Sequence, residues 1–296
     1  MIPLFCYRVS FAALPFLFID EKHDRIAHLR NELSTRDIPL NYHIYTEINS
    51  FDGTLTGLLD DLDRKGARLA PTFAFIDPFG FKGAPFSLVQ RLLRNPSTEV
   101  FINVMTDSVN RFLVHSGVQQ HIVDLFGTRE VMQVARSSNR IDHLRLLYLQ
   151  QLQREACFVR YFEMCNECDR KIYYLFFASN HRVGHIKMKE AFWRVDNQGG
   201  YRFSDRTNPQ QPVLFALDPA HDLASVLQDK YAGQTESVEV ISHFVEDETA
   251  FTAAHTRKAL AWLEQERQIT VNAIKSDGKK RRKNTFPDGV ILCFPE

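Results

Sequence analysis

The feature that most constrains this chain is an apolar run, residues 72–80, which ends in an acid, a proline, an aromatic residue and a glycine. The first five residues, Thr-Phe-Ala-Phe-Ile, are typical of a strand that is buried on both faces of a parallel sheet. Pro78 and Gly80 would stop this strand directly after Asp77. Because ligands bind outside the carboxyl ends of strands in open α/β sheets, Asp77 is a candidate functional residue. An Asp-Pro pair that only opens a turn explains the same pattern equally well.

Strand and helix patterns alternate on both sides of this run. Residues 16–19, 42–45 and 99–105 are short apolar strands, and stripes of leucine and isoleucine at helical spacing lie between them. Two alternating apolar runs, residues 158–164 and 172–178, predict a β-hairpin. Strands that alternate with helices and finish in an antiparallel pair predict an α/β, Rossmann-like sheet of the methyltransferase type.

Acidic residues follow the two strands that precede residue 72. Asp20 and Glu21 come directly after the first strand, and Glu47 lies in a polar turn after the second. In nucleotide-binding sheets, an acid in this place accepts hydrogen bonds from ribose hydroxyls. The alternative is that these carboxylates only favour the positive end of the helix that follows. Both interpretations remain open from the sequence.

The end of the chain has a different pattern. Residues 238–245 and 252–265 predict two helices, residues 269–274 and 289–294 predict two strands, and a basic loop joins the strands. This order is that of a winged helix. We therefore expect a Rossmann-like domain over residues 1–220 and a winged-helix-like module over residues 235–296. Residues 196–211 are polar and form either a loop over the sheet or the start of a linker.

The basic loop is the candidate nucleic-acid contact. A wing that places positive side chains along phosphates gains affinity by releasing counterions. The formal net charge of the chain is zero, so any affinity for DNA or RNA must come from such a local patch. A solvated charge run is the competing interpretation. The candidate residues are Lys279, Lys280, Arg281, Arg282 and Lys283.

Composition limits the class of protein. With 296 residues, 44% hydrophobic and 24% charged, the chain is typical of an ordinary globular protein, and no apolar window is long enough for a membrane helix. Five cysteines, an odd number, favour reduced thiols and a cytoplasmic location. Cys165 and Cys168 resemble half of a zinc ribbon, but a structural zinc needs four ligands and no second pair exists. We therefore predict no metal site.

The tetrapeptide from Asp77 to Gly80 resembles the Asp-Pro-Pro-Tyr type motif of amino-methyltransferases. The resemblance implies that Asp77 and a backbone carbonyl accept hydrogen bonds from an exocyclic amine, while an aromatic ring stacks on a flipped base. Phe79 stands where the second proline would be, and Gly80 stands where the aromatic residue would be. Asp77, Pro78 and Phe79 are the catalytic candidates.

Several ordered motifs together resemble the three-Cys-motif partner protein family, TcmP, over nearly the whole chain. They are residues 16–33, residues 75–80, residues 175–181 with Gly184 and Met188 after them, and residues 252–274. The resemblance implies a methyltransferase-like protein with S-adenosylmethionine as its cofactor. It also implies a phage-related, three-Cys-motif (Gp37/Gp68-type) protein as its partner, which resembles radical S-adenosylmethionine enzymes.

One departure from that pattern concerns the cofactor. A methyltransferase sheet opens with a strand and a glycine-rich turn, but Gly53 is the first glycine of this sequence. A gene truncated at its start, a misassigned start codon or a family member that has lost cofactor binding would each explain this. We expect the sheet to lack its first, central strand and to leave a hydrophobic edge unfilled.

These features support two hypotheses. The first is a methyltransferase-like protein that acts on or with nucleic acid, with Asp77 orienting an amine beside Asn103 and Asp107, and with Asp20 near the cofactor ribose. The alternative is a catalytically inactive interaction and DNA-binding partner of the three-Cys-motif protein. Loss of function on removing the wing, but not on replacing Asp77, would favour the second.

Overall fold

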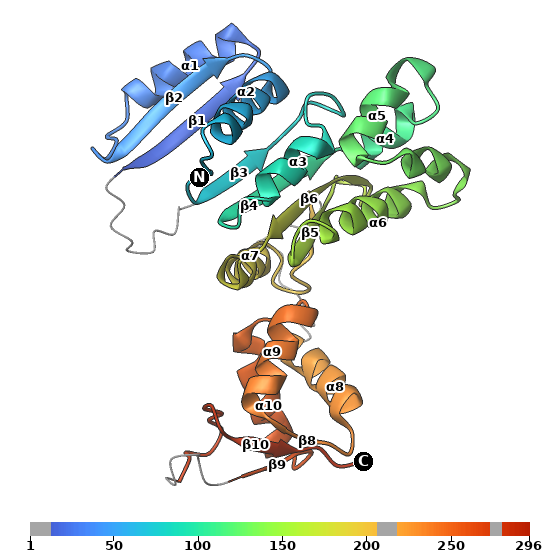
Figure 1. Ribbon diagram of the computed structural model, residues 1–296. Coiled ribbons are helices and arrows are strands. Elements are labelled where there is room, and N and C mark those ends of the chain that lie inside the picture. Colours follow the sequence, from blue (N-terminus) through green and yellow to red (C-terminus); the bar gives the residue numbers. More distant parts are fainter. Residues whose placement is uncertain (1–12, 206–217, 273–279) are drawn as a thin grey trace.

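The computed structural model describes residues 13–205, 218–272 and 280–296 of the chain (Figure 1). Their secondary structure is mixed α/β. Hydrogen bonding divides the described strands into a two-stranded sheet, a five-stranded sheet and a three-stranded sheet. The first two sheets come from the amino-terminal and central parts of the chain, and the third comes from its carboxyl-terminal part.

The two-stranded sheet pairs β1 (Leu14–Asp20) with β2 (Tyr42–Ile48) in parallel. Helix α1 (His23–Ser34) connects the two strands, and α2 (Phe51–Arg64) follows β2. Ser50 caps α2 by accepting a hydrogen bond from the backbone N–H of Gly53. Leu55 and Leu59 of α2 belong to the main hydrophobic core, so this helix packs toward the rest of the domain.

The five-stranded sheet has the order β3-β4-β6-β5-β7. Strands β3 (Thr72–Ile76) and β4 (Thr98–Val104) are parallel, whereas β6 (Lys171–Ser179) is antiparallel to both β4 and β5 (Phe158–Cys165). The short strand β7 (Arg202–Ser204) is parallel to β5. The predicted hairpin is therefore confirmed as β5 and β6, and the central sheet is mixed.

Helices cover this sheet. Those that precede the hairpin are α3 (Phe86–Leu93), α4 (Thr106–Phe112), the 3-10 turn η1 (Ser116–Val118), α5 (Gln119–Phe126), the 3-10 segment η2 (Arg129–Arg136) and α6 (Arg140–Gln153). Tyr148 of α6 is fully buried among the rings of Phe86, Phe126 and Phe176. Helix α7 (Arg182–Val195) follows β6 and brings Phe192 against Phe162 of β5.

One face of strand β3 is less covered than the sequence predicts. Among the described residues, β3 pairs only with β4, and β1 pairs only with β2. Ile76 is buried, but the side chains of Phe73 and Phe75 are 55% and 58% exposed. The expectation that residues 72–76 are buried on both faces is therefore wrong. Phe192 of α7 reaches the ring of Phe101 on β4, and the next strand outward, β3, keeps one face open.

The carboxyl-terminal elements have a hydrophobic core of their own. Helices α8 (Pro219–Tyr231), α9 (Val238–Glu248) and α10 (Ala253–Gln265) pack on an antiparallel sheet of order β8-β10-β9. Its strands are β8 (Thr235–Ser237), β9 (Thr270–Val271) and β10 (Ile291–Cys293). The predicted order of two helices followed by two strands is confirmed. Leu223 and Leu227 place α8 in the same core, so it packs with this module.

Candidate functional site at the carboxyl ends of β3 and β4

Asp77 and Asn103 meet where two parallel strands end. Asp77 follows β3 directly and is exposed, and Asn103 is the penultimate residue of β4. The Nδ2 group of Asn103 donates a hydrogen bond to Oδ1 of Asp77 across 2.8 Å. The side-chain carbonyl of Asn103, Oδ1, is buried without a hydrogen-bond partner. The predicted neighbourhood of Asp77 and Asn103 is confirmed, and the exposed carboxylate of Asp77 is the group of this pair that a ligand can reach.

Asp107 lies in the first turn of α4 and is held by two guanidinium groups. Its Oδ2 atom is 3.3 Å from Nε of Arg111, and its Oδ1 atom accepts a hydrogen bond from Arg170. Arg170 directly precedes β6, so this ion pair ties the tip of the hairpin to α4. Because both of its oxygens are engaged by cations, Asp107 is better suited to fix this edge of the sheet than to bind a ligand.

Tyr173 adds a phenol to the same edge, which sequence reasoning did not identify. Burial raises the pKa of Tyr173, and the negative charges of Asp77 and Asp205 raise it further. The phenol therefore lies within the electrostatic reach of Asp77. It comes from β6, the antiparallel neighbour of β4, and only the strand order brings it here.

The turn after Asp77 presents an aromatic ring to solvent. The side chain of Phe79 is 95% exposed, and Pro78 is half-buried. Gly80 has a φ of 88°, a left-handed conformation that favours glycine and turns the chain away from the strand. An exposed ring next to an exposed carboxylate is the arrangement that could stack on a base while the carboxylate accepts from its amine.

The predicted cofactor-binding acids lie at the ends of β1 and β2. Asp20 ends β1, and Glu47 is paired in register with Ile19 of the same strand. The Oδ1 atom of Asp20 accepts from the backbone N–H of Lys22 at 2.8 Å, and its Oδ2 atom is 3.2 Å from Arg25. The hydrogen bond from Lys22 is the main reason that the pKa of Asp20 is lowered. Asp20 therefore already acts as an anchor for the start of α1.

These acids do not by themselves make a site for S-adenosylmethionine. Glu21 and Glu47 are exposed, and both oxygens of Asp20 are engaged. The first glycine of the chain, Gly53, lies inside α2 and not in a turn after a strand. Without a glycine turn, the described residues provide no close approach of backbone to the cofactor. We therefore derive no methyl-transfer step from this arrangement.

The basic residues after β9 divide into two groups. Lys280, Arg282 and Lys283 are exposed, whereas Lys279 lies outside the described residues. The side chain of Arg281 is only 6% exposed and forms an ion pair with Glu264 of α10. Arg281 also donates from Nε to the carbonyl oxygen of Asn272 at 3.1 Å. It thus fastens the loop to α10, and the exposed cations on either side of it are the groups available to a phosphate backbone.

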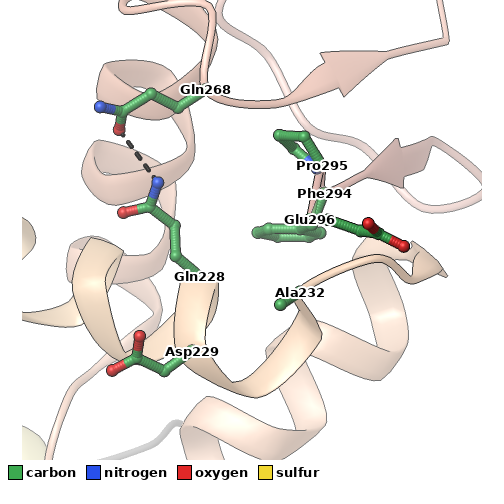
Figure 2. Close-up of a pocket in the computed structure, with 7 residues that line it drawn as sticks. All are labelled: Gln228, Asp229, Ala232, Gln268, Phe294, Pro295 and Glu296. Carbon is green, nitrogen blue, oxygen red and sulfur yellow. Dashed lines mark hydrogen bonds between the residues drawn. The ribbon is translucent and has the colours of Figure 1, made fainter.

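A shallow pocket lies in the carboxyl-terminal module, away from these residues. It has a volume of about 360 Å³, and the close-up shows Gln228 and Gln268 joined by a hydrogen bond of 3.3 Å on one side (Figure 2). The ring of Phe294 and the carboxylate of Glu296 lie on the other side. None of the residues lining it is a predicted site residue, and no cation lines it.

The hairpin places Cys165 and Cys168 in different environments. Cys165 is buried at the end of β5, whereas Cys168 is exposed in the turn. The Cys165 thiol contacts Glu163 at 3.4 Å and Arg202 at 3.3 Å. Burial raises the pKa of the Cys165 thiol. Over residues 13–205, 218–272 and 280–296, no group of three or more His, Cys, Asp or Glu side chains is placed to hold a metal ion.

Comparisons of this chain with protein-family models, with curated proteins and with solved structures found no match. Within the described part of the chain, no helix has both the length and the apolar character needed to span a bilayer. The geometry of the site itself therefore has to support any functional proposal.

Proposed function

We propose that this protein binds DNA or RNA through its carboxyl-terminal module, which we interpret as winged-helix-like. One observation supports this most directly. Three helices pack on the sheet β8-β10-β9, and the exposed cations Lys280, Arg282 and Lys283 lie in the connection between β9 and β10. In winged helices, this connection is the wing that lies along a nucleic-acid backbone. Helix α10 also has two exposed cations, Arg257 and Lys258.

The second part of the proposal concerns the Rossmann-like sheet. We propose that Asp77 accepts a hydrogen bond from an exocyclic amine of a base, while Phe79 stacks on that base. Asn103 orients Asp77 through the hydrogen bond of 2.8 Å. The exposure of Asp77 and Phe79 supports this role, because neither group has to move out of a core to reach a ligand.

A salt titration tests the wing. Binding of a fluorescein-labelled DNA duplex is followed by anisotropy at several salt concentrations, for the wild type and for Arg282→Ala/Lys283→Ala. If both cations contact phosphates, the slope of log Kd against log salt falls by about 2 in the variant. The variant Arg64→Ala/Lys65→Ala removes two exposed cations at the carboxyl end of α2 and should bind like the wild type. An unchanged slope in the wing variant would overturn the proposal.

A base-analogue experiment tests Asp77. A single-stranded adenine oligonucleotide is compared with one in which every adenine is replaced by unsubstituted purine, which lacks the amine. The wild type should bind the adenine strand about 10-fold more tightly, because a charged acceptor with a good donor is worth about 1.5–3 kcal/mol. Asp77→Ala should lose this preference and keep its salt dependence. Equal preference in both proteins would exclude Asp77 as the amine acceptor.

Methyl transfer with S-adenosylmethionine is a second candidate function. It is favoured by the antiparallel β5–β6 pair at the end of the alternating strands and helices, an ending common in sheets of the methyltransferase type. Calorimetry of S-adenosylmethionine with the full chain tests it, and absence of heat would leave the inactive, nucleic-acid-binding alternative. A three-Cys-motif protein, proposed as the partner, would be tested by co-purification with wild type and with Asp77→Ala.

A further inference from the structure

A second pocket lies where the carboxyl-terminal end of α7 meets the amino-terminal end of α10. Helix α7 is on the side of the central domain that faces the carboxyl-terminal module, so both modules contribute to the lining (Figure 1). The pocket has a volume of about 350 Å³. We call it the junction pocket, and the lining residues that bear on binding are Glu190, Trp193, Arg194, Asn197, His255 and Arg257.

Positive charge exceeds negative charge in the junction pocket. Arg194 in the last turn of α7 and Arg257 in the second turn of α10 both line it. The carboxylate of Glu190 lines it as well, but its Oε2 atom accepts from Nζ of Lys187 at 2.8 Å. Two guanidinium groups thus share the pocket with one carboxylate that has a lysine partner. A bound anion would relieve the repulsion between the two arginines.

Two uncharged groups add hydrogen-bond donors to this charge. The side chain of Asn197 lines the pocket and brings an amide nitrogen that can donate. Nδ1 of His255 accepts from the backbone N–H of Thr252 at 3.1 Å, so the neutral ring carries its proton on Nε2 as a donor. Burial is the largest cause of the lowered pKa of His255, and this favours the neutral ring. The pocket therefore offers charged and neutral donors to one ligand.

The aromatic wall of the junction pocket is held in place by the protein itself. Nε1 of Trp193 donates to the carbonyl oxygen of Ala250 at 2.7 Å, and the indole ring stacks on Phe251. The ring centroids of Trp193 and His255 are 4.3 Å apart. Gly200, with a φ of 69°, packs so closely that a Cβ atom there would lie 2.5 Å from the indole ring. This wall needs no ordering when a ligand binds, which favours affinity.

The loop that carries Asn197 is also fixed. Both carboxylate oxygens of Asp196 accept hydrogen bonds from backbone N–H groups within residues 198–202, at distances of 3.1 to 3.2 Å. The backbone N–H of Asp196 in turn donates to the carbonyl oxygen of Phe192 at 2.9 Å, which ties the loop to the end of α7. Asn197, next to Asp196 in the chain, therefore keeps a defined place at the pocket.

We propose that the junction pocket binds a phosphate group. Guanidinium groups match the oxygens of phosphate in geometry and charge, and the amide and imidazole groups add neutral donors. Two arginines also suit a phosphate monoester, whose charge is about −1.5 to −2 at pH 7. The phosphate belongs either to a free phosphorylated compound or to the backbone of a nucleic acid. The proposal holds whether or not the wing binds nucleic acid, because the wing is not part of this pocket.

Trp193 lines the pocket and gives a local reporter of its occupancy. The chain has two tryptophans, so Trp262→Phe leaves Trp193 as the single emitter. In this background, inorganic phosphate and adenosine 5′-monophosphate should each change the emission in a saturable way. Adenosine, which lacks the phosphate, should not change it at the same concentration. Calorimetry of the wild type with the same three compounds gives the Kd values without a reporter.

Substitutions of the two arginines test their part in binding. Arg194→Met and Arg257→Met each remove a charged donor and should raise the Kd for inorganic phosphate about tenfold or more. Arg257→Lys keeps the charge without the planar guanidinium and should lose less than Arg257→Met. Arg267→Met is the matched control, because Arg267 is an exposed arginine beyond the far end of α10, and it should bind like the wild type. If circular dichroism shows that Arg194→Met does not fold, Arg257→Met, at an exposed position, carries the test.

A competition experiment identifies the source of the phosphate. A short single-stranded thymine oligonucleotide is added to protein that is saturated with inorganic phosphate. If the pocket takes a backbone phosphate, the oligonucleotide displaces the free phosphate, and Arg194→Met weakens oligonucleotide binding about tenfold. If the pocket takes a free phosphorylated compound, phosphate stays bound and Arg194→Met leaves oligonucleotide binding unchanged. Either result supports the phosphate pocket.

The phosphate titration does not depend on the wing, so its failure and the failure of the salt titration are separate results. Two outcomes would overturn the phosphate pocket. The first is the absence of a saturable response to both inorganic phosphate and adenosine 5′-monophosphate. The second is an equal Kd for phosphate in Arg194→Met, Arg257→Met and Arg267→Met.

Discussion

Asn103 donates from its side-chain nitrogen to Asp77 across 2.8 Å and so joins the ends of the parallel strands β4 and β3. Asn103 is 9% exposed, whereas Asp77 is exposed, so the buried amide holds a carboxylate that faces solvent. One oxygen of Asp77 is engaged by this bond. The same bond fixes the direction of the second carboxylate oxygen. The flexible side chain of Asp77 thus becomes a fixed hydrogen-bond acceptor at the edge of the sheet.

Removing the amide should destabilise the protein more than removing the acid. Asn103→Ala deletes the donor to Asp77 and leaves a small cavity, so we expect a loss of about 1–2 kcal/mol in the free energy of unfolding. Asp77→Asn retains an oxygen that accepts the same bond, and its cost should be under about 0.5 kcal/mol. Urea unfolding measured by far-UV circular dichroism compares the two variants. Equal costs would show that the hydrogen bond does not hold this edge.

Arg281 should behave as a structural residue, unlike its neighbour Arg282. Arg281→Met leaves the carboxylate of Glu264, which is 16% exposed, without its partner, and we expect a cost of about 1–3 kcal/mol in the free energy of unfolding. Adding Glu264→Leu should restore most of the loss, because two apolar side chains replace the pair. Arg282→Ala, at an exposed position, should change stability by under about 0.5 kcal/mol. Thermal unfolding of the three variants gives the comparison.

The roles of the two arginines show where sequence reasoning stops. A run of basic residues predicts a charged loop, and the loop is present after β9, but its pattern does not say which side chain turns inward. That depends on Glu264, which is 17 residues away in the chain. The helix–helix–strand–strand order and the β5–β6 hairpin were predictable, because local periodicity and spacing determine them.

Other features depended on contacts between distant segments. The end of α9 contacts Arg160 of β5 and both His185 and Lys189 of α7, and isolated His and Lys residues in a helix give no sign of such a contact. Helix α8 did have a local signal, since Asp218 caps it, Pro219 is its first residue, and Leu223 and Leu227 follow at helical spacing. The open face of β3 was missed because an aromatic run indicates a strand but not the number of layers that cover it.

Strand β3 should tolerate polar residues at positions that sequence reasoning assigned to the core. Phe75 is more than half exposed, so Phe75→Thr should cost under about 1 kcal/mol, mainly through its contact with Phe101. Phe75 pairs in register with Phe101 of β4, and the next residue of β4, Ile102, is fully buried. Ile102→Ala should therefore cost about 2–5 kcal/mol in the free energy of unfolding. Urea unfolding tests both. A cost for Phe75→Thr as large as that for Ile102→Ala would mean that another segment covers β3 in solution.

Thiol labelling should divide the cysteines by burial and not by sequence spacing. Cys165 is 4% exposed, and burial raises the pKa of its thiol, so little reactive thiolate forms at pH 8. Cys168, three residues later, is exposed in the hairpin turn and should react at least about tenfold faster with N-ethylmaleimide.

Mass spectrometry of peptides from a Cys6→Ser protein resolves the individual sites. Cys157, exposed directly before β5 and at the opposite end of that strand from the turn, is the internal reference for a free thiol. Added zinc should leave the labelling of Cys168 unchanged relative to Cys157, since its hairpin partner is held by Glu163 and Arg202 inside the sheet. Protection of Cys165 and Cys168 together by zinc, reversed by a chelator, would instead show that the pair binds metal and that the hairpin tip rearranges to do so.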